Sequence, residues 1–150
     1  MIVLYFVDRE LMETRIVYLE SLINELEKSE TPSTLFSKMA TERMCHMIIE
    51  TVMDIGNQMI DGFIMRDPGS YEDILNIMVD EKVLLKKEGD ALTSLIPWRK
   101  DLLQQYTQLN DKDLYDAFQS QMEALKTFPL KVRSYLKTEL GPVSAFLPEK

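Results

Sequence analysis

The stretch ERMCHMIIETVMDIGNQMID at residues 42–61 points to the fold of this chain. Wound at about 100° per residue, it places apolar side chains around nearly the whole circumference of a helix. Six polar side chains fall within an arc of roughly 80°, and Thr51 and Gln58 are exceptions outside it. We call this arc the polar stripe, and it consists of Arg43, His46, Glu50, Asp54, Asn57 and Asp61. Because a helix that is apolar on most sides must be covered by other helices, the stretch predicts the central helix of an all-α bundle.

The segment before this stretch carries a single apolar stripe. Its members alternate in steps of four and three residues, the spacing of an amphipathic helix; they are Met12, Ile16, Leu19, Ile23 and Leu26. Asp8 is the expected N-cap, and Val7 and Met12 are placed to pack together across the helix start. Pro32 is well placed to begin the central helix, which we expect to run from about Leu35 to Ile64.

Loop and cap signals divide the chain after the central helix. RDPGS, residues 66–70, is the clearest loop. Ser70 followed by Asp73 resembles a capping box and predicts a short helix over 71–79. A further helix over roughly 85–107 should bend near Pro97, because proline removes a helical hydrogen bond.

The last predicted helix begins at Asn110 or Asp111, either of which can cap it. Its apolar residues keep one register across Pro129, which predicts a kink at that proline; they are Leu114, Phe118, Leu125, Phe128, Val132 and Tyr135. The sequence thus predicts one domain over residues 1–140, an up-and-down bundle of about five helices. Residues 141–150, GPVSAFLPEK, are expected to form a flexible tail.

Composition narrows the classes of function. The formal net charge of the 150-residue chain is −8, which argues against non-specific binding of DNA or RNA, because that requires many Lys or Arg contacts to phosphate. The apolar start MIVLYFV is too short for a signal-peptide core or a membrane span. A single cysteine fits a reducing compartment. We therefore expect a cytoplasmic protein that binds neither DNA nor a membrane.

The polar stripe allows three interpretations. It can face water, as the polar side of any surface helix does. It can instead line a polar groove, in which the side chains of Arg43, His46, Glu50, Asp54 and Asn57 bond to one another. A metal site is the third interpretation, and the stripe disfavours it because di-iron bundles repeat a Glu-x-x-His step on two helices. We therefore predict no metal and no cofactor.

Two longer stretches resemble a known family. ERMCHMIIETVMDIGNQMIDGFIMRDPGSYEDIL at residues 42–75 and YFVDRELMETRIVYLE at residues 5–20 are similar to the HepT-like branch of the HEPN superfamily. The D-I-G-N step followed by R-D-P-G-S-Y carries most of the resemblance, which extends from residue 5 to about residue 137. The resemblance implies a small helical bundle that forms homodimers. Many members are metal-independent ribonucleases that act as toxins, paired with a minimal nucleotidyltransferase antitoxin.

The family's active-site motif is an arginine, four to six residues and a histidine, often extended as His-x-Tyr. In PWRKDLLQQY, residues 97–106, the arginine corresponds to Arg99 and the tyrosine to Tyr106. The histidine position falls on Gln104, where the resemblance fails. In one continuous helix Arg99 and Tyr106 would point within about 20° of each other, and Gln104 about 140° away from Arg99.

Gln104 changes the chemistry that the motif can perform. In the family's ribonucleases the arginine would hold the scissile phosphate, and the histidine would remove the proton of the ribose 2′-hydroxyl. A glutamine amide can hold a phosphate or a hydroxyl, but it does not accept that proton. Loss of a general base typically costs about 10²–10⁴-fold in rate. The resemblance also makes Tyr106 a candidate acceptor of nucleotide groups from a partner transferase.

Three hypotheses follow for the function. The first is a homodimeric HEPN-type protein with a degraded ribonuclease motif, which binds or regulates RNA or a nucleotide through Arg99, Gln104 and Tyr106. The second is a ribonuclease toxin that is still active because His46 supplies the missing base, which requires the central helix to face Arg99. The third is a scaffold whose polar stripe only specifies how the helices pack.

Overall fold

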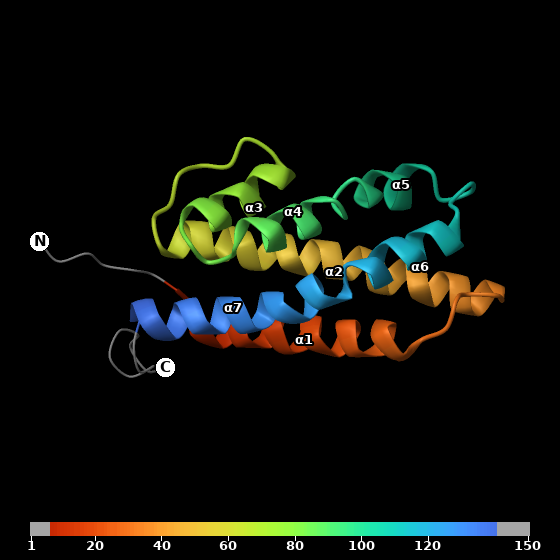
Figure 1. The fold of residues 1–150 in the computed structure, drawn as a ribbon, viewed down its shortest axis with the longest axis horizontal. Helices are drawn as coiled ribbons and strands as arrows, with labels where there is room; N and C mark the ends of the chain where they lie inside the picture. The colour runs from red at the N-terminus through yellow and green to blue at the C-terminus, as the bar shows by residue number, and fades with distance from the viewer. Residues whose placement is uncertain (1–6, 141–150) are drawn as a thin grey trace, which may run out of the picture.

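The computed structural model describes residues 7–140 of the chain. These residues form an all-α bundle of seven helices without a strand (Figure 1): α1 Arg9–Lys28, α2 Leu35–Gly62, α3 Tyr71–Asp80, α4 Lys86–Thr93, α5 Trp98–Gln104, α6 Asp111–Ser120 and α7 Met122–Leu140. The all-α prediction is confirmed. The predicted tail at residues 141–150 lies outside the described residues.

Helix α2 is the central element of the bundle. It packs against α1 on one side and against α3, α5 and α6 on others, while α7 lies along α1 (Figure 1). Twelve of its residues are buried, which explains why its sequence is apolar on nearly every side. No helix of the described region is long and apolar enough to cross a membrane.

The ends of α1 and α2 follow from their caps. Asp8 Oδ1 accepts a hydrogen bond from the Leu11 amide at 3.0 Å, as predicted, and all five members of the α1 stripe are buried. Helix α2 begins at Leu35, as predicted, because Thr34 and Ser37 cap each other's backbone amides there. It ends at Gly62 rather than Ile64, whose φ of 55° is left-handed and incompatible with a continuing helix.

Two of the predicted helices are each divided in two. The helix expected over roughly 85–107 is broken into α4 and α5 by a turn over residues 94–97; proline at position 97 has no N–H with which to continue the α4 hydrogen bonds. The last predicted helix begins after Asn110, which caps it as expected. It is interrupted at Gln121, and α7 then continues through Pro129, so the break lies elsewhere than at the proline.

A close approach of α3 to α2 depends on a glycine. A Cβ at Gly56 would collide with the Ile74 Cγ2 atom and lie 3.3 Å from the Met78 sulfur. Ile74 and Met78 are both buried against α2. The glycine of the D-I-G-N step therefore sets how near α3 lies to the central helix.

Candidate functional site

The carboxylate of Glu50 joins two side chains that the sequence left unconnected. Its Oε1 atom accepts a hydrogen bond from Arg99 Nε at 2.6 Å and lies 3.2 Å from His46 Nε2. The three side chains are about equally half-buried, with exposed fractions of 27% for Arg99, 25% for Glu50 and 23% for His46. One carboxylate thus brings the motif arginine of α5 and the imidazole of α2 into the same site.

The flat face of the Arg99 guanidinium is also supported. Its Cζ atom lies 4.6 Å from the centre of the Tyr71 ring, a cation–π contact. The bond to Glu50 uses Nε. Within the described part of the chain, no acceptor is bonded to the two terminal nitrogens of Arg99. These two nitrogens form the edge with which an arginine binds a phosphate bidentately.

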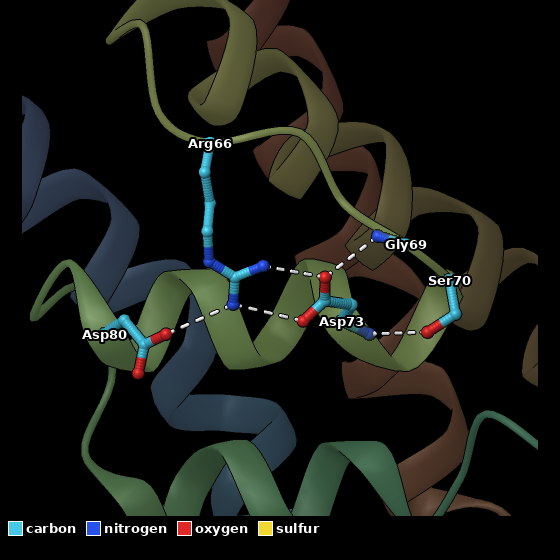
Figure 2. A network of polar contacts seen from close by, with 5 residues as sticks. All are labelled: Arg66, Gly69, Ser70, Asp73 and Asp80. Carbon is cyan, nitrogen blue, oxygen red and sulfur yellow. Dashed lines mark hydrogen bonds and ion pairs between the residues drawn. The ribbon is translucent and has the colours of Figure 1, made fainter.

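Tyr71 is itself held in place by the loop before it. Arg66 donates to both carboxylate oxygens of Asp73, at 2.8 and 3.1 Å, and to Asp80 at 3.2 Å (Figure 2). The Gly69 amide donates to Asp73 at 2.8 Å, and Ser70 caps α3 by accepting from the Asp73 amide at 3.1 Å. We call these five residues the Arg66 cluster. It fixes the first turn of α3, where Tyr71 begins the helix.

The Arg66 cluster shows what the polar residues of the R-D-P-G-S-Y segment do in the structure. Asp73 accepts hydrogen bonds from the Arg66 guanidinium and from the Gly69 amide, and these bonds lower its pKa to about 2. The predicted capping box is confirmed for the Ser70 side chain, while the Asp73 carboxylate bonds to Arg66 and Gly69. The cluster thus remains intact at any pH at which Asp73 is ionised.

The remaining members of the polar stripe have no such contacts. Arg43, Asp54 and Asn57 are exposed on α2, as is Asp61. The stripe therefore faces solvent along most of its length, and only His46 and Glu50 are partly covered, where α5 lies against α2. Of the pairings proposed for a polar groove, the structure contains one between His46 and Glu50.

The other two motif positions lie at the end of α5. Helix α5 ends at Gln104, which is exposed, and Gln105 is its C-cap. Tyr106 follows in a turn and is 66% exposed. The angular estimate for one continuous helix was therefore wrong for Tyr106, because the helix ends before it. Arg99 is held against the bundle, whereas Gln104 and Tyr106 project toward solvent.

Sequence reasoning missed Tyr71, and it did not connect Glu50 to Arg99. Tyr71 stood inside the R-D-P-G-S-Y segment, but nothing local in the sequence indicates that its ring supports an arginine on another helix. Trp98, the first residue of α5, is half-buried against the core. Arg99, the next residue, bonds to Glu50 on α2.

A second polar contact joins α2 to α6. The Asp111 Oδ2 atom is buried and has no hydrogen-bond donor among the described residues. Burial, together with hydrogen bonding to Asp111, raises the pKa of Glu42 to about 7. Because two carboxylates cannot bond unless one is protonated, a proton on Glu42 satisfies the buried oxygen.

Comparison with known proteins agrees with this architecture. The model of the family described as "Ribonuclease HepT-like" matches residues 12–132. A Bacillus subtilis (strain 168) protein named "Putative RNase YutE" is 48% identical over 143 residues, covering 95% of this chain and 99% of the relative. The solved structure of YutE, described as a cytosolic protein of unknown function, has a TM-score of 0.91 and covers 95% of this chain and 100% of its own.

Two more distant solved structures share the fold. One is a toxin–antitoxin with AMP-PNP, with a TM-score of 0.75 at 14% identity, covering 83% of this chain and 98% of that chain. The other is a tri-AMPylated Shewanella oneidensis HEPN toxin in complex with MNT antitoxin, with a TM-score of 0.72 at 15% identity, covering 82% of this chain and 96% of that chain. At such identities the likeness establishes the helical arrangement.

Proposed function

Because this chain belongs to the Ribonuclease HepT-like family, we propose that it binds RNA and holds one RNA phosphate at Arg99. The observation that carries the proposal is the double support of the guanidinium: Glu50 bonds its Nε and Tyr71 stacks on its face. This support orients the two terminal nitrogens in advance, so little side-chain entropy is lost when a phosphate binds.

Binding is proposed as the main activity because the motif lacks its own proton acceptor. Gln104 stands where the family has histidine, and its amide can donate to a phosphate or ribose oxygen without removing a proton. Without the motif histidine, cleavage should be slower by about 10²–10⁴-fold than in a member with the intact motif. The chain would then act on its RNA as a binding or regulatory module.

A partner transferase is the second part of the proposal. Tyr106 is 66% exposed, so its hydroxyl is accessible to an enzyme that transfers nucleotide groups. The distant structural relative that is described as a tri-AMPylated toxin in complex with MNT antitoxin supports a partner of the minimal nucleotidyltransferase class. Modification of Tyr106, which lies seven residues after Arg99, would add negative charge to the protein and weaken RNA binding.

We also propose that the chain forms a homodimer in the cytosol and that residues 1–140 act as one domain. Large apolar side chains at the start of α2 support self-association, since contiguous exposed apolar patches mark interfaces. Phe36 is 85% exposed, and Leu35 and Met39 beside it are 71% and 57% exposed. The cytosolic description of YutE supports the location.

The proposed RNA site is tested by binding of a fluorescent single-stranded RNA to the purified full chain. Arg99→Ala should weaken binding at least tenfold. Lys137→Ala removes the same charge from an exposed site on α7. It should change affinity less than twofold, although this variant has the same net charge as Arg99→Ala. Equal affinities of the two variants would show that Arg99 does not hold a phosphate.

Purification with nucleases excluded separates binding from cleavage. If the wild-type chain cut RNA as fast as a family member with an intact motif, the role as a binding module would be overturned. If no RNA bound at any salt concentration, the scaffold hypothesis would remain.

A further inference from the structure

Resting on the proposed RNA site, we propose that His46 replaces the missing motif histidine as the proton acceptor for RNA cleavage. The inference starts from a shared ligand: His46 Nε2 and Arg99 Nε lie 3.2 and 2.6 Å from the same Glu50 Oε1 atom. His46 is also the only histidine of the chain. No other side chain of the chain offers an imidazole.

The direction of the helices places this imidazole on the correct side of Arg99. Helices α2 and α5 run in opposite directions along each other (Figure 1). His46 precedes Glu50 by one helical turn on α2, and Gln104 follows Arg99 by somewhat more than one turn on α5. One turn is about 5.4 Å along the helix axis. Along the two helix axes, His46 and position 104 therefore lie on the same side of the Glu50–Arg99 contact.

The Glu50 carboxylate selects the tautomer that a base requires. An ionised carboxylate only accepts hydrogen bonds, so the imidazole nitrogen facing it, Nε2, carries the proton. The neutral ring then has its lone pair on Nδ1. A carboxylate that orients a histidine in this way also stabilises the imidazolium that forms when the ring takes a second proton. Glu50 is a positioning residue for both His46 and Arg99.

The reaction balances with groups that the site and water supply. The terminal nitrogens of Arg99 hold two non-bridging oxygens of the phosphate. His46 Nδ1 takes the proton of the ribose 2′-hydroxyl, and the 2′-oxygen forms a bond to phosphorus. The bond from phosphorus to the 5′-oxygen breaks, and that oxygen leaves as an alcohol after taking a proton from water. The His46 imidazolium returns its proton to the hydroxide so formed, and the RNA fragment ends in a 2′,3′-cyclic phosphate.

The test measures cleavage and binding of the same RNA by the full-length protein. His46→Asn should lower the single-turnover cleavage rate at least a hundredfold and leave RNA affinity within about threefold, because the base does not hold the phosphate. An RNA with 2′-deoxyribose at the cut site should bind and remain uncut. Melting by circular dichroism checks that each variant is folded.

Chemical rescue distinguishes a base from a packing residue. Imidazole added to the buffer should restore cleavage by His46→Gly at least tenfold. Added imidazole should not restore cleavage by Glu50→Gln. That variant still has the His46 imidazole and has lost only the carboxylate that orients it. An unchanged cleavage rate in His46→Asn, or the absence of rescue in a folded His46→Gly, would overturn the inference.

The two proposals fail differently. RNA that binds in an Arg99-dependent manner but is never cut would overturn the role of His46 and leave the binding site intact. Arg99→Ala binding RNA as tightly as the wild type would overturn the binding site itself.

Discussion

Arg99 Nε lies 2.6 Å from Glu50 Oε1, and this ion pair joins the short helix α5 to the central helix of the bundle. Both side chains are about three-quarters covered, with exposed fractions of 27% and 25%. An ion pair in such a place is screened less by water than a surface pair, yet it keeps part of its hydration. Its contribution to stability should therefore lie between those of exposed and buried pairs.

A double-mutant cycle of Glu50→Gln and Arg99→Gln should give a coupling energy of about 1–2 kcal/mol. Glu50→Gln keeps the side-chain volume and removes the charge. Arg99→Gln shortens the side chain and also removes its contact with Tyr71, a loss that cancels in the cycle. Urea unfolding of the four proteins measures the coupling. Destabilisations that simply add would show that the pair is not formed in solution. Lys86 and Asp90, an exposed pair on α4, provide a comparison for which the coupling should be below about 0.5 kcal/mol.

Two substitutions of Gln104 test whether a side chain at position 104 reaches the ribose and the phosphate of bound RNA. Gln104→His restores the family motif beside Arg99, so cleavage of RNA should rise about 10²-fold and no longer depend on His46. Gln104→Glu places a negative charge near the phosphate and should weaken RNA affinity several-fold. Rates are measured under single turnover. A folded Gln104→His protein that cleaves no faster than the wild type would mean that position 104 does not reach the ribose.

Gly56→Ala should move α3 away from α2. Because the added Cβ would collide with Ile74 Cγ2, we expect a loss of about 1–3 kcal/mol in the free energy of unfolding. RNA affinity should fall as well, since Tyr71 on α3 supports Arg99. Gly69→Ala is the matched control: its Cβ would meet only the Asp73 carboxylate oxygen, at 3.7 Å. Equal stability of the two variants in thermal melts would contradict the role given to Gly56.

Glu42 makes stability depend on pH. Burial and hydrogen bonding to Asp111 raise the pKa of Glu42 in the folded chain to about 7, from its ordinary value of about 4.5. Between these two values the folded state binds more protons than the unfolded state, so this contribution falls as pH rises toward 7 and stays lost above it. Glu42→Gln removes the ionisation, so its melting temperature should exceed that of the wild type more at about pH 8 than at about pH 5. A difference that is constant with pH would rule out the shared proton.

Phe36→Asp should shift the protein toward monomer. The side chain is 85% exposed in the single chain, so the substitution costs little stability in a monomer and places a charge in the proposed interface. Light scattering over a range of concentrations measures the mass. Leu130→Asp, at another exposed apolar position on α7 with an exposed fraction of 62%, should leave the dimer unchanged. A wild-type mass that remains monomeric at every concentration would refute self-association.

The sequence predicted the helices most accurately where apolar periodicity is long. The α1 stripe is buried as expected, and α2 begins and ends within two residues of its predicted limits. Helix breaks were predicted less well. Gln121 interrupts the last predicted helix although the apolar register continues across it, because register is preserved by any short turn that keeps the same face toward the core.

The site required information that periodicity does not contain. Local sequence identified Arg99 by its motif and His46 and Glu50 by their place in the polar stripe. Only the packing of α5 against α2 brought the three together on one carboxylate, and only the packing of α3 added Tyr71. These contacts join residues on three helices, so their distances depend on interhelical packing that no single segment encodes.

By itself the amino-acid sequence determined that this chain is a helical bundle with a central helix, that its motif lacks a histidine, and where its caps and loops lie. These properties follow from local backbone preferences and from the burial of apolar side chains, both of which act over a few residues. The tertiary structure decided which polar groups meet. A half-buried guanidinium must find a carboxylate partner, and that partner is set by the geometry of packed helices, here Glu50 between Arg99 and the lone imidazole.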